Sequence, residues 1–182
     1  MQLLTQRLHL RNFTADDWPA VLAYQSDPRY LRYYEWESRV EAEVRSFVQM
    51  FLDQQAEQPR RKFQLAVCLR GDDQLIGNCG LRLNPANPRL ADIGYELAPD
   101  HWGRGYATEA ARAMLAFGFT ELKVHRVESW CIAENTGSWR VMEKLGLQRE
   151  GQLRDKEWLK GRWWNILLYG ILESEWRPNH PN

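Results

Sequence analysis

The feature of this sequence that most restricts its fold is a change of hydrophobic period between residues 90 and 132. Apolar and polar residues alternate over 91–97, which is typical of a half-buried strand. After two glycines, small and apolar residues recur at helical spacing, namely Ala107, Ala110, Ala111, Met114, Leu115 and Gly118. A further strand is expected over 124–132. This strand–helix–strand unit has the length of a right-handed parallel crossover, and its helix is suited to close packing on a sheet.

The remaining segments predict more strands and helices around this crossover. Alternation or apolar runs indicate strands over 3–12, 63–69, 75–83, 147–156 and 162–173. Helical patterns and caps indicate helices over 14–24, 39–57 and 135–145. The middle strands follow short turns and are expected to be antiparallel. The prediction is an α/β fold of mixed α+β type, as one domain over residues 1–182, with a central mixed, mostly antiparallel sheet and helices on both faces.

Composition narrows the classes of function. The 182 residues carry 24 Lys and Arg against 24 Asp and Glu, so no global field attracts nucleic acid or an anionic membrane. The sequence has no signal-peptide pattern and no apolar run of the ~18 residues that a membrane span needs. Cys68, Cys79 and Cys131 lack metal-ligand spacing, which predicts buried free thiols and no metal site. We therefore expect a cytoplasmic protein without direct nucleic-acid or membrane partners.

A glycine turn between the strand and the helix of the crossover is the first candidate for chemistry. Gly103-Arg104-Gly105 would present several backbone N–H groups, backed by the positive end of the following helix. Phosphate binds at such positions, and glycine lets it approach the backbone. No Lys-Ser or Lys-Thr follows, as a P-loop requires, and Thr108 replaces the third glycine of a dinucleotide-binding turn. Taken alone, these glycines favour the interpretation of a purely structural turn.

The neighbours of this turn carry a more specific pattern. The run His101-Trp102-Gly103-Arg104-Gly105-Tyr106-Ala107-Thr108-Glu109 follows Tyr95-Glu96-Leu97, and Asn135-Thr136-Gly137-Ser138 precedes Glu143-Lys144-Leu145-Gly146. On these residues and on Thr5-Gln6-Arg7-Leu8-His9-Leu10-Arg11, the chain resembles the GCN5-related N-acetyltransferase (GNAT) superfamily over residues 3–175. Trp102 departs from the Gln or Arg that begins the superfamily's phosphate signature. In having this tryptophan, the chain is similar to the branch of ribosomal-protein N-terminal (alanine or serine) acetyltransferases.

The resemblance implies acetyl-CoA as cosubstrate, bound between the strand that ends near Leu97 and the strand at 124–131. The pyrophosphate would lie on the glycine turn. Asn135 would bond the pantetheine arm, and it also suits a plain helix cap. Arg104 and Arg140 would neutralise phosphates or be ordinary surface arginines. The implied cofactor-binding residues are Leu97, Ala98, Trp102, Gly103, Arg104, Gly105, Tyr106, Ala107, Thr108, Asn135, Ser138 and Arg140.

The implied reaction is attack of a neutral amine on the thioester carbonyl, and it calls for three groups. The catalytic base would be Glu96 or Glu157, and either could instead be a solvated strand or loop residue. A backbone N–H of residues 97–98 would polarise the carbonyl. Ser138 is the candidate donor to the leaving thiolate, because Met142 stands where many superfamily members place a tyrosine.

The acceptor amine stays open between a protein N-terminus, which the branch favours, and a small molecule such as a polyamine, an amino acid or an amine antibiotic. An α-amine has a pKa near ~8 and a lysine near ~10.4, so the N-terminus needs less help from a base. The aromatic and basic segment 25–62 is expected to border the acceptor. A CoA-binding sensor without catalysis and an RNA-associated protein are further alternatives, the latter disfavoured by zero net charge. The Trp-rich C-terminal strand is compatible with a homodimer.

Overall fold

The computed structural model describes residues 1–177, which form one eight-stranded sheet flanked by helices. Its order is β1-β2-β3-β4-β5-β6-β8-β7, and only the neighbours β5 and β6 are parallel among the described strands. The strands are β1 (Gln2–Leu4), β2 (Leu8–Arg11), β3 (Lys62–Leu69), β4 (Leu75–Leu83), β5 (Leu90–Leu97), β6 (Arg126–Ile132), β7 (Gln148–Leu159) and β8 (Arg162–Leu172). The helices are η1 (Ala15–Asp17), α1 (Trp18–Gln25), α2 (Pro28–Leu31), α3 (Glu41–Ala56), η2 (Pro99–His101), α4 (Tyr106–Thr120) and α5 (Thr136–Lys144).

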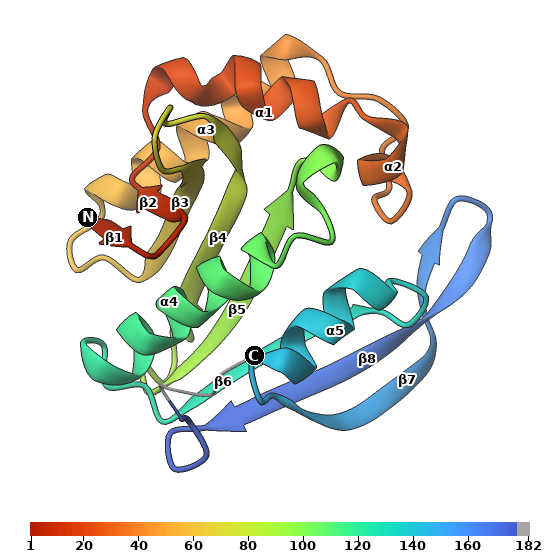
Figure 1. The fold of residues 1–182 in the computed structure, drawn as a ribbon. Helices are drawn as coiled ribbons and strands as arrows, with labels where there is room; N and C mark the ends of the chain where they lie inside the picture. The colour runs from red at the N-terminus through yellow and green to blue at the C-terminus, as the bar shows by residue number, and fades with distance from the viewer. Residues whose placement is uncertain (178–182) are drawn as a thin grey trace.

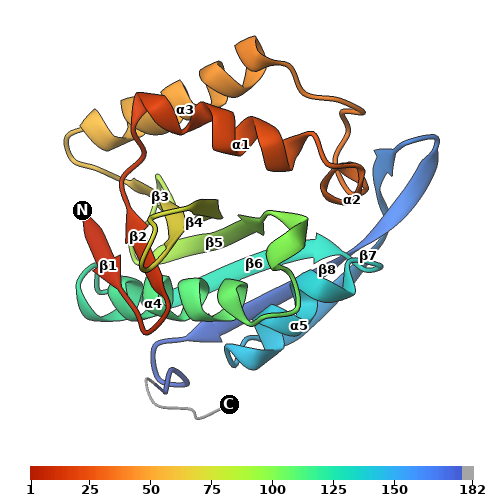
Figure 2. The same ribbon diagram turned by 45° about the horizontal axis from the view of Figure 1, so that its top comes forward.

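Helices cover both faces of this sheet, so the predicted fold class is confirmed. Figures 1 and 2 show α1 and α3 on one face and α4 and α5 on the other. A large core including Leu65, Leu81 and Leu115 lies on the α4–α5 side, and a smaller one around Phe13 and Val48 lies under α1 and α3. The parallel crossover β5–α4–β6 that the sequence predicts is present.

Helix α4 packs against the sheet with the small-residue face that the sequence predicts. Ala111, Met114 and Leu115 are fully buried. A Cβ on Gly118 would lie 2.8 Å from a methyl carbon of Leu81 on β4, closer than normal van der Waals contact. Gly118 therefore lets α4 approach the sheet more closely than a larger residue would allow.

The N-terminal strand differs from the sequence prediction. The single strand expected over 3–12 is a hairpin of β1 and β2, joined by a turn over residues 5–7. The Thr5 amide donates to the Leu8 carbonyl at 2.9 Å, and the Leu8 amide donates to the Thr5 hydroxyl at 2.9 Å. Since these bonds satisfy the turn without glycine or proline, alternation alone gives no sign of the break.

The chain also contains a short helix that the sequence did not predict. The helix expected over 14–24 ends as α1 at Gln25. Asp27 then caps α2, accepting a hydrogen bond from the Arg29 amide at 2.8 Å, and Pro28 takes the first helical position. Near the C-terminus, the strand expected over 147–156 continues to Leu159 as β7.

The three cysteines are free and buried, as predicted. Burial raises the pKa of Cys68 and Cys79 to about 12 and that of Cys131 to about 11, so their thiols stay protonated at neutral pH. Among residues 1–177, no helix is long and apolar enough to cross a membrane. The same residues contain no cluster of three or more His, Cys, Asp or Glu side chains that could hold a metal ion.

The C-terminal tryptophans divide into two exposed and two buried side chains. Trp158 and Trp163 are 60% and 54% exposed, and their ring centroids lie 5.2 Å apart across the β7–β8 hairpin. Trp164 and Trp176 are buried. The exposed pair is compatible with self-association, which stays a prediction.

We expect Gly118→Val to destabilise the fold, because the added methyl groups would push α4 away from Leu81 and Val124. Overpacking of this kind lowers the free energy of unfolding by about 1–3 kcal/mol. Gly137→Val on α5 is the matched control, since a Cβ there meets its nearest neighbouring atom at an ordinary 3.7 Å. Chemical denaturation followed by circular dichroism measures both variants. Equal stabilities would contradict the close packing of α4.

Candidate active site

The candidate site is an opening between the parallel strands β5 and β6. The two strands pair only over residues 90–92 and 126–128, although β5 continues to Leu97 and β6 to Ile132. Where the pairing stops, the Ser129 hydroxyl donates to the Ile93 carbonyl at 2.9 Å. Beyond this bond, residues 93–97 and 129–132 form what we call the β5–β6 opening, with backbone groups directed into it. It lies where the sequence predicts the cofactor.

The two amides predicted to polarise the thioester carbonyl differ in their surroundings. The Ala98 amide donates to the Ile76 carbonyl on β4 at 2.7 Å and is therefore engaged in the sheet. Because ladder hydrogen bonds alternate between the two sides of a strand, the Leu97 amide points into the β5–β6 opening. The Leu97 carbonyl also points away from β4 and accepts from the Trp102 indole N–H at 2.7 Å. Of these two residues, Leu97 is the one that offers an amide to a ligand in the opening.

The glycine turn connects η2 to the first residue of α4. Gly103 and Gly105 have φ values of 74° and 81°, in the left-handed region that favours glycine. The Glu109 amide donates to the Gly105 carbonyl at 3.0 Å, which closes the first turn of α4. The amides of residues 106–108 precede that bond, so they and the helix dipole are available to an anion. Glycine is thus needed for the backbone conformation as well as for the access that the sequence suggests.

The other predicted residues around the turn differ in exposure. Trp102 is 47% exposed even though its indole N–H bonds the Leu97 carbonyl. Arg104 and Arg140 have exposed side chains, and the Arg140 guanidinium carbon lies 5.4 Å from the Trp139 ring centroid. This exposure fits either of the roles predicted for the two arginines. On α4, the first two predicted residues are half-buried and the third is buried: Tyr106, Ala107 and Thr108.

Helix α5 begins beside the opening and brings Asn135 and Ser138 together. The Asn135 side-chain oxygen accepts from the Ser138 amide at 3.2 Å, so the predicted N-cap is present. Tyr95 on β5 donates its hydroxyl proton to the Ser138 carbonyl at 2.7 Å, and its oxygen lies 3.4 Å from the Ser138 hydroxyl. Burial raises the pKa of Tyr95, so this hydroxyl stays a donor. Met142 is 1% exposed and packs in the core.

The Glu96 carboxylate, one of the two predicted bases, is surrounded by donors. Five side chains donate to it: Tyr24 at 2.7 Å, Gln25 at 3.1 Å and Asn78 at 2.5 Å to Oε1, and Tyr30 at 2.5 Å and Tyr34 at 3.3 Å to Oε2. Burial and the nearby Glu96 charge raise the pKa of the three tyrosines, so their hydroxyls stay protonated. Since a carboxylate has about four lone-pair sites, Glu96 has little capacity left to receive a proton from a substrate.

These bonds attach the α1–α2 segment to the sheet. Tyr24 belongs to α1, Tyr30 to α2 and Asn78 to β4, so one carboxylate joins two helices and two strands. The rings of Tyr30 and Tyr34 stack with centroids 4.5 Å apart. Glu96 therefore lies on the α1–α2 face of β5, opposite the residues buried under α4, as the alternation of this strand predicts.

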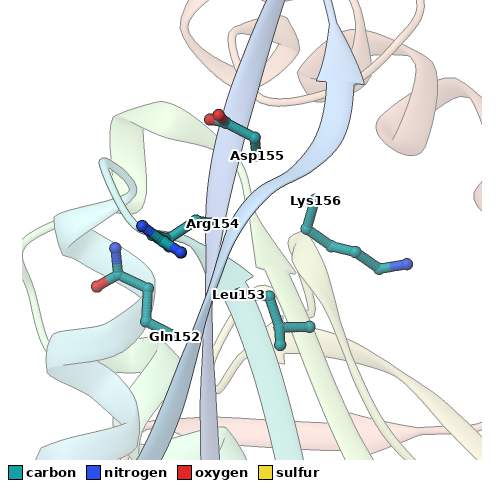
Figure 3. Close-up of a pocket in the computed structure, with 5 residues that line it drawn as sticks. All are labelled: Gln152, Leu153, Arg154, Asp155 and Lys156. Carbon is teal, nitrogen blue, oxygen red and sulfur yellow. The ribbon is translucent and has the colours of Figure 1, made fainter.

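Glu157, the other predicted base, has an exposed side chain on the edge strand β7. Immediately before it the strand bulges, because residues 154–156 lie opposite Asn165 alone. The Asn165 side chain accepts from the Asp155 amide at 2.9 Å and secures the bulge. Figure 3 shows the side chains of residues 152–156, which line a pocket at this point. The bulge changes the direction of β7 immediately before Glu157.

The β7–β8 hairpin reaches the α1–α2 side of the molecule (Figures 1 and 2). The Lys160 ammonium donates to the Leu31 carbonyl at the end of α2 at 2.9 Å. Tyr33 packs edge-on against Trp164, and its hydroxyl donates to the Glu134 carbonyl at 2.9 Å. The segment expected to border the acceptor thus contacts both the hairpin that carries Glu157 and the loop before α5.

Sequence reasoning missed several residues that shape this site. Tyr24 and Tyr30 reach Glu96 across 72 and 66 residues, and Arg7 pairs with Glu109 across 102. The aromatic character of segment 25–62 is the one signal for Tyr30, and Tyr24 lies just outside that segment. Tyr95 stood in a recognised motif but was given no role, and its partner Ser138 lies 43 residues away.

Comparison with known proteins agrees with this geometry. Residues 7–148 match the model of the acetyltransferase (GNAT) domain family. The chain belongs to the GNAT family of acetyltransferases. The resemblance found in the sequence is therefore confirmed, and the protein is an N-acetyltransferase.

Similar N-acetyltransferases cover 96–97% of the chain. The uncharacterized N-acetyltransferase p20 of Bacillus licheniformis is 34% identical over 175 residues, covering 96% of this chain and 97% of its own. The uncharacterized N-acetyltransferase YnaD of Bacillus subtilis is 35% identical over 176 residues, with 97% and 99% covered. A GNAT acetyltransferase structure from Bacillus anthracis superposes with a TM-score of 0.84 at 34% identity, covering 96% of this chain and all of that one.

We expect Tyr30→Phe to destabilise this N-acetyltransferase, because it removes a donor from the half-buried Glu96 carboxylate. Loss of a hydrogen bond to a charged group lowers the free energy of unfolding by about 1.5–3 kcal/mol. Tyr33→Phe is the matched control, since it removes an exposed hydrogen bond to a carbonyl and should change stability by about 0.5 kcal/mol or less. Denaturant unfolding compares the two. A Tyr30→Phe protein as stable as the control would contradict the anchoring role of Glu96.

Proposed function

We propose that this N-acetyltransferase acts in the cytoplasm and transfers the acetyl group of acetyl-CoA to the α-amino group of a protein N-terminus. The observation that supports the proposal is the environment of the two candidate bases. The Glu96 carboxylate is occupied by five donors, and the Glu157 side chain is exposed. Neither environment is suited to deprotonating a strongly basic amine.

An α-amine fits such a site because its pKa is close to neutrality. With a pKa of about 7.7–8.0, roughly a tenth of such amines are uncharged at pH 7. With a pKa of about 10.4, only about one lysine amine in 2,500 is uncharged at that pH. The alkyl amines of polyamines resemble lysine in this respect. A weakly basic acceptor therefore needs only a solvated carboxylate such as Glu157 to receive its proton.

Acetyl-CoA would lie in the β5–β6 opening. The amides of residues 103–108 would hold the pyrophosphate, with Arg104 and Arg140 close to the phosphates. The pantetheine arm would pair with the edge of β5 as an added strand does, and the amide group of Asn135 would bond it. The contact of Trp102 with the Leu97 carbonyl fixes the end of that edge. The structure of the fold relative RimL is in complex with coenzyme A, which supports CoA as the ligand of this fold.

The chemical step would use the groups that face the opening. The amine nitrogen attacks the thioester carbonyl carbon while the Leu97 amide stabilises the developing oxyanion. The C–N bond forms, the C–S bond breaks, and the amine's proton passes to Glu157 or to water beside it. The Ser138 hydroxyl, which lies 3.4 Å from the Tyr95 hydroxyl, donates a hydrogen bond to the leaving CoA thiolate, and the thiolate then takes its proton from water. A thiol pKa near ~8.5 makes the thiolate a tolerable leaving group, so a weak donor is sufficient.

Two more distant relatives represent the two acceptor classes. The structure of RimL, titled ribosomal L7/L12 alpha-N-protein acetyltransferase in complex with coenzyme A, has a TM-score of 0.82 and 19% identity, covering 93% of this chain and 96% of that one. Spermidine N(1)-acetyltransferase of Escherichia coli is 27% identical over 92 residues, half of each chain. The first likeness is one of fold, and it extends over nearly all of both molecules. It supports the N-terminal acceptor, with a small-molecule amine as the alternative.

Release of free CoA with a matched pair of peptides tests the acceptor class. The first peptide has a free α-amine and no lysine, and the second has the same sequence with a blocked N-terminus and one added lysine. At pH 7 we expect turnover of the first peptide, and none of the second or of spermidine. Turnover of spermidine or free amino acids instead would favour the small-molecule class. Binding of acetyl-CoA without any turnover would favour a non-catalytic CoA-binding module.

We expect Glu157→Gln to lower kcat for the α-amine peptide by up to about tenfold at pH 7, because only roughly a tenth of such amines are uncharged without help from a base. The deficit should shrink at pH 9, because an α-amine with a pKa near ~8 is then mostly uncharged and needs no base. Glu96→Gln is the contrasting variant, and its main effect should be loss of stability. Steady-state kinetics at both pH values, with unfolding curves, measure these effects. A pH-independent deficit in Glu157→Gln would remove Glu157 as the base.

A further inference from the structure

The turn between β1 and β2 contacts the start of α4. The Arg7 Nε donates to Glu109 Oε2 at 2.7 Å, and Arg7 Nη2 lies 2.7 Å from the same oxygen. The Arg7 amide and the Thr5 hydroxyl donate to Glu109 Oε1 at 2.8 Å and 2.6 Å. Glu109 belongs to the first turn of α4. Four contacts therefore fix the β1–β2 turn to the N-terminus of the helix that follows the glycine turn.

The same guanidinium also contacts the glycine turn itself. Arg7 Nη1 donates to the Arg104 carbonyl at 3.0 Å, and the guanidinium carbon lies 4.6 Å from the centroid of the Tyr106 ring. In a planar trans peptide unit, the C=O and the N–H point in opposite directions. Because Arg7 binds the carbonyl of residue 104, the Gly105 amide of that peptide unit points away from Arg7. Arg7 thus holds this part of the turn from the side opposite to the Gly105 amide.

The ion pair also removes an electrostatic conflict at the proposed phosphate site. A carboxylate in the first turn of α4 would repel a pyrophosphate bound at that helix N-terminus. Burial tends to raise the pKa of Glu109, but the bonds from Thr5 and Arg7 outweigh burial and lower it, so Glu109 is ionised at neutral pH. Because Arg7 neutralises this carboxylate, the helix N-terminus keeps its attraction for an anion.

We propose that Arg7 is a positioning residue for acetyl-CoA, which fixes the turn at residues 103–105 in its phosphate-binding conformation before the cofactor arrives. This inference rests on the proposed binding of acetyl-CoA at the turn and is independent of the acceptor. The shape of the guanidinium, and not its charge alone, is what the arrangement requires. Its nitrogens bind a carboxylate and a carbonyl at fixed positions, which the single ammonium group of lysine cannot do.

Calorimetric titration with CoA tests the role of Arg7. In Arg7→Ala and in Arg7→Lys alike, we expect the Kd for CoA to rise on the order of tenfold, as loss of a hydrogen bond to a charged group does. The KM for acetyl-CoA should rise by the same ratio, with kcat at saturating acetyl-CoA and the KM of the acceptor unchanged. S-acetylpantetheine lacks the pyrophosphate, so wild type and both variants should use it equally well as acetyl donor.

Arg45→Ala is the matched control. Arg45 also pairs with a carboxylate, Glu41 at 2.7 Å, and lies over an aromatic ring, that of Trp18, at 4.0 Å, but it is on α3. We expect it to bind CoA with wild-type affinity. Arg7→Lys keeps a positive charge at this position, so it carries the test if Arg7→Ala fails to fold. Thermal unfolding of each free variant identifies such a failure.

Two results with the variants would overturn the inference. Unchanged CoA affinity in Arg7→Ala would show that the turn does not depend on Arg7. Wild-type affinity in Arg7→Lys would show that a point charge is sufficient, as for a direct phosphate contact. Wild-type protein that binds no CoA would instead refute the proposed cofactor site and this inference with it. If N-terminal peptides are not acetylated while CoA binds normally, only the proposed acceptor is refuted, because calorimetry still reports on Arg7.

Discussion

The site depends on the early separation of β5 and β6. Parallel strands that stayed paired to Leu97 and Ile132 would satisfy each other's backbone groups, but their pairing stops at residues 92 and 128. Ser129 and Trp102 supply donors to two of the β5 carbonyls that lose a strand partner. The Leu97 amide remains directed into the opening. The interruption of the sheet therefore provides an edge on which an extended ligand can bind as a strand would.

Local sequence signals predicted the elements around this opening because the crossover uses contiguous residues. The change from alternation to helical spacing locates β5 and α4, and Asn135 and Gly105 mark helix starts with residues whose local chemistry is distinctive. The N-terminal hairpin shows the limit of such signals. Its turn is closed by the side chain and backbone of Thr5, and an unbroken alternation is compatible with one strand or two.

The polar contacts that define the site could not be predicted in this way. Periodicity indicates which face of a strand or helix is buried, and it gives no information on which polar groups meet there. Glu96 is assigned to the correct face by alternation, but the donors on α1 and α2 that occupy it depend on how those helices pack. The bulge before Glu157 depends likewise on Asn165 of the next strand.

Three glutamates of this protein differ in their hydrogen-bond partners, and this difference separates structural roles from the proposed catalytic one. Glu96 and Glu109 are committed to fixed donors, one joining α1 and α2 to the sheet and the other joining the β1–β2 turn to α4. Glu157 is exposed to solvent, and in the proposed reaction it would receive the proton of the bound amine. A carboxylate in water is a weak base, so it suits an acceptor that releases its proton near neutral pH. The commitment of Glu96 to the fold and the proposed preference for an α-amine would then be consequences of the same distribution of hydrogen-bond donors.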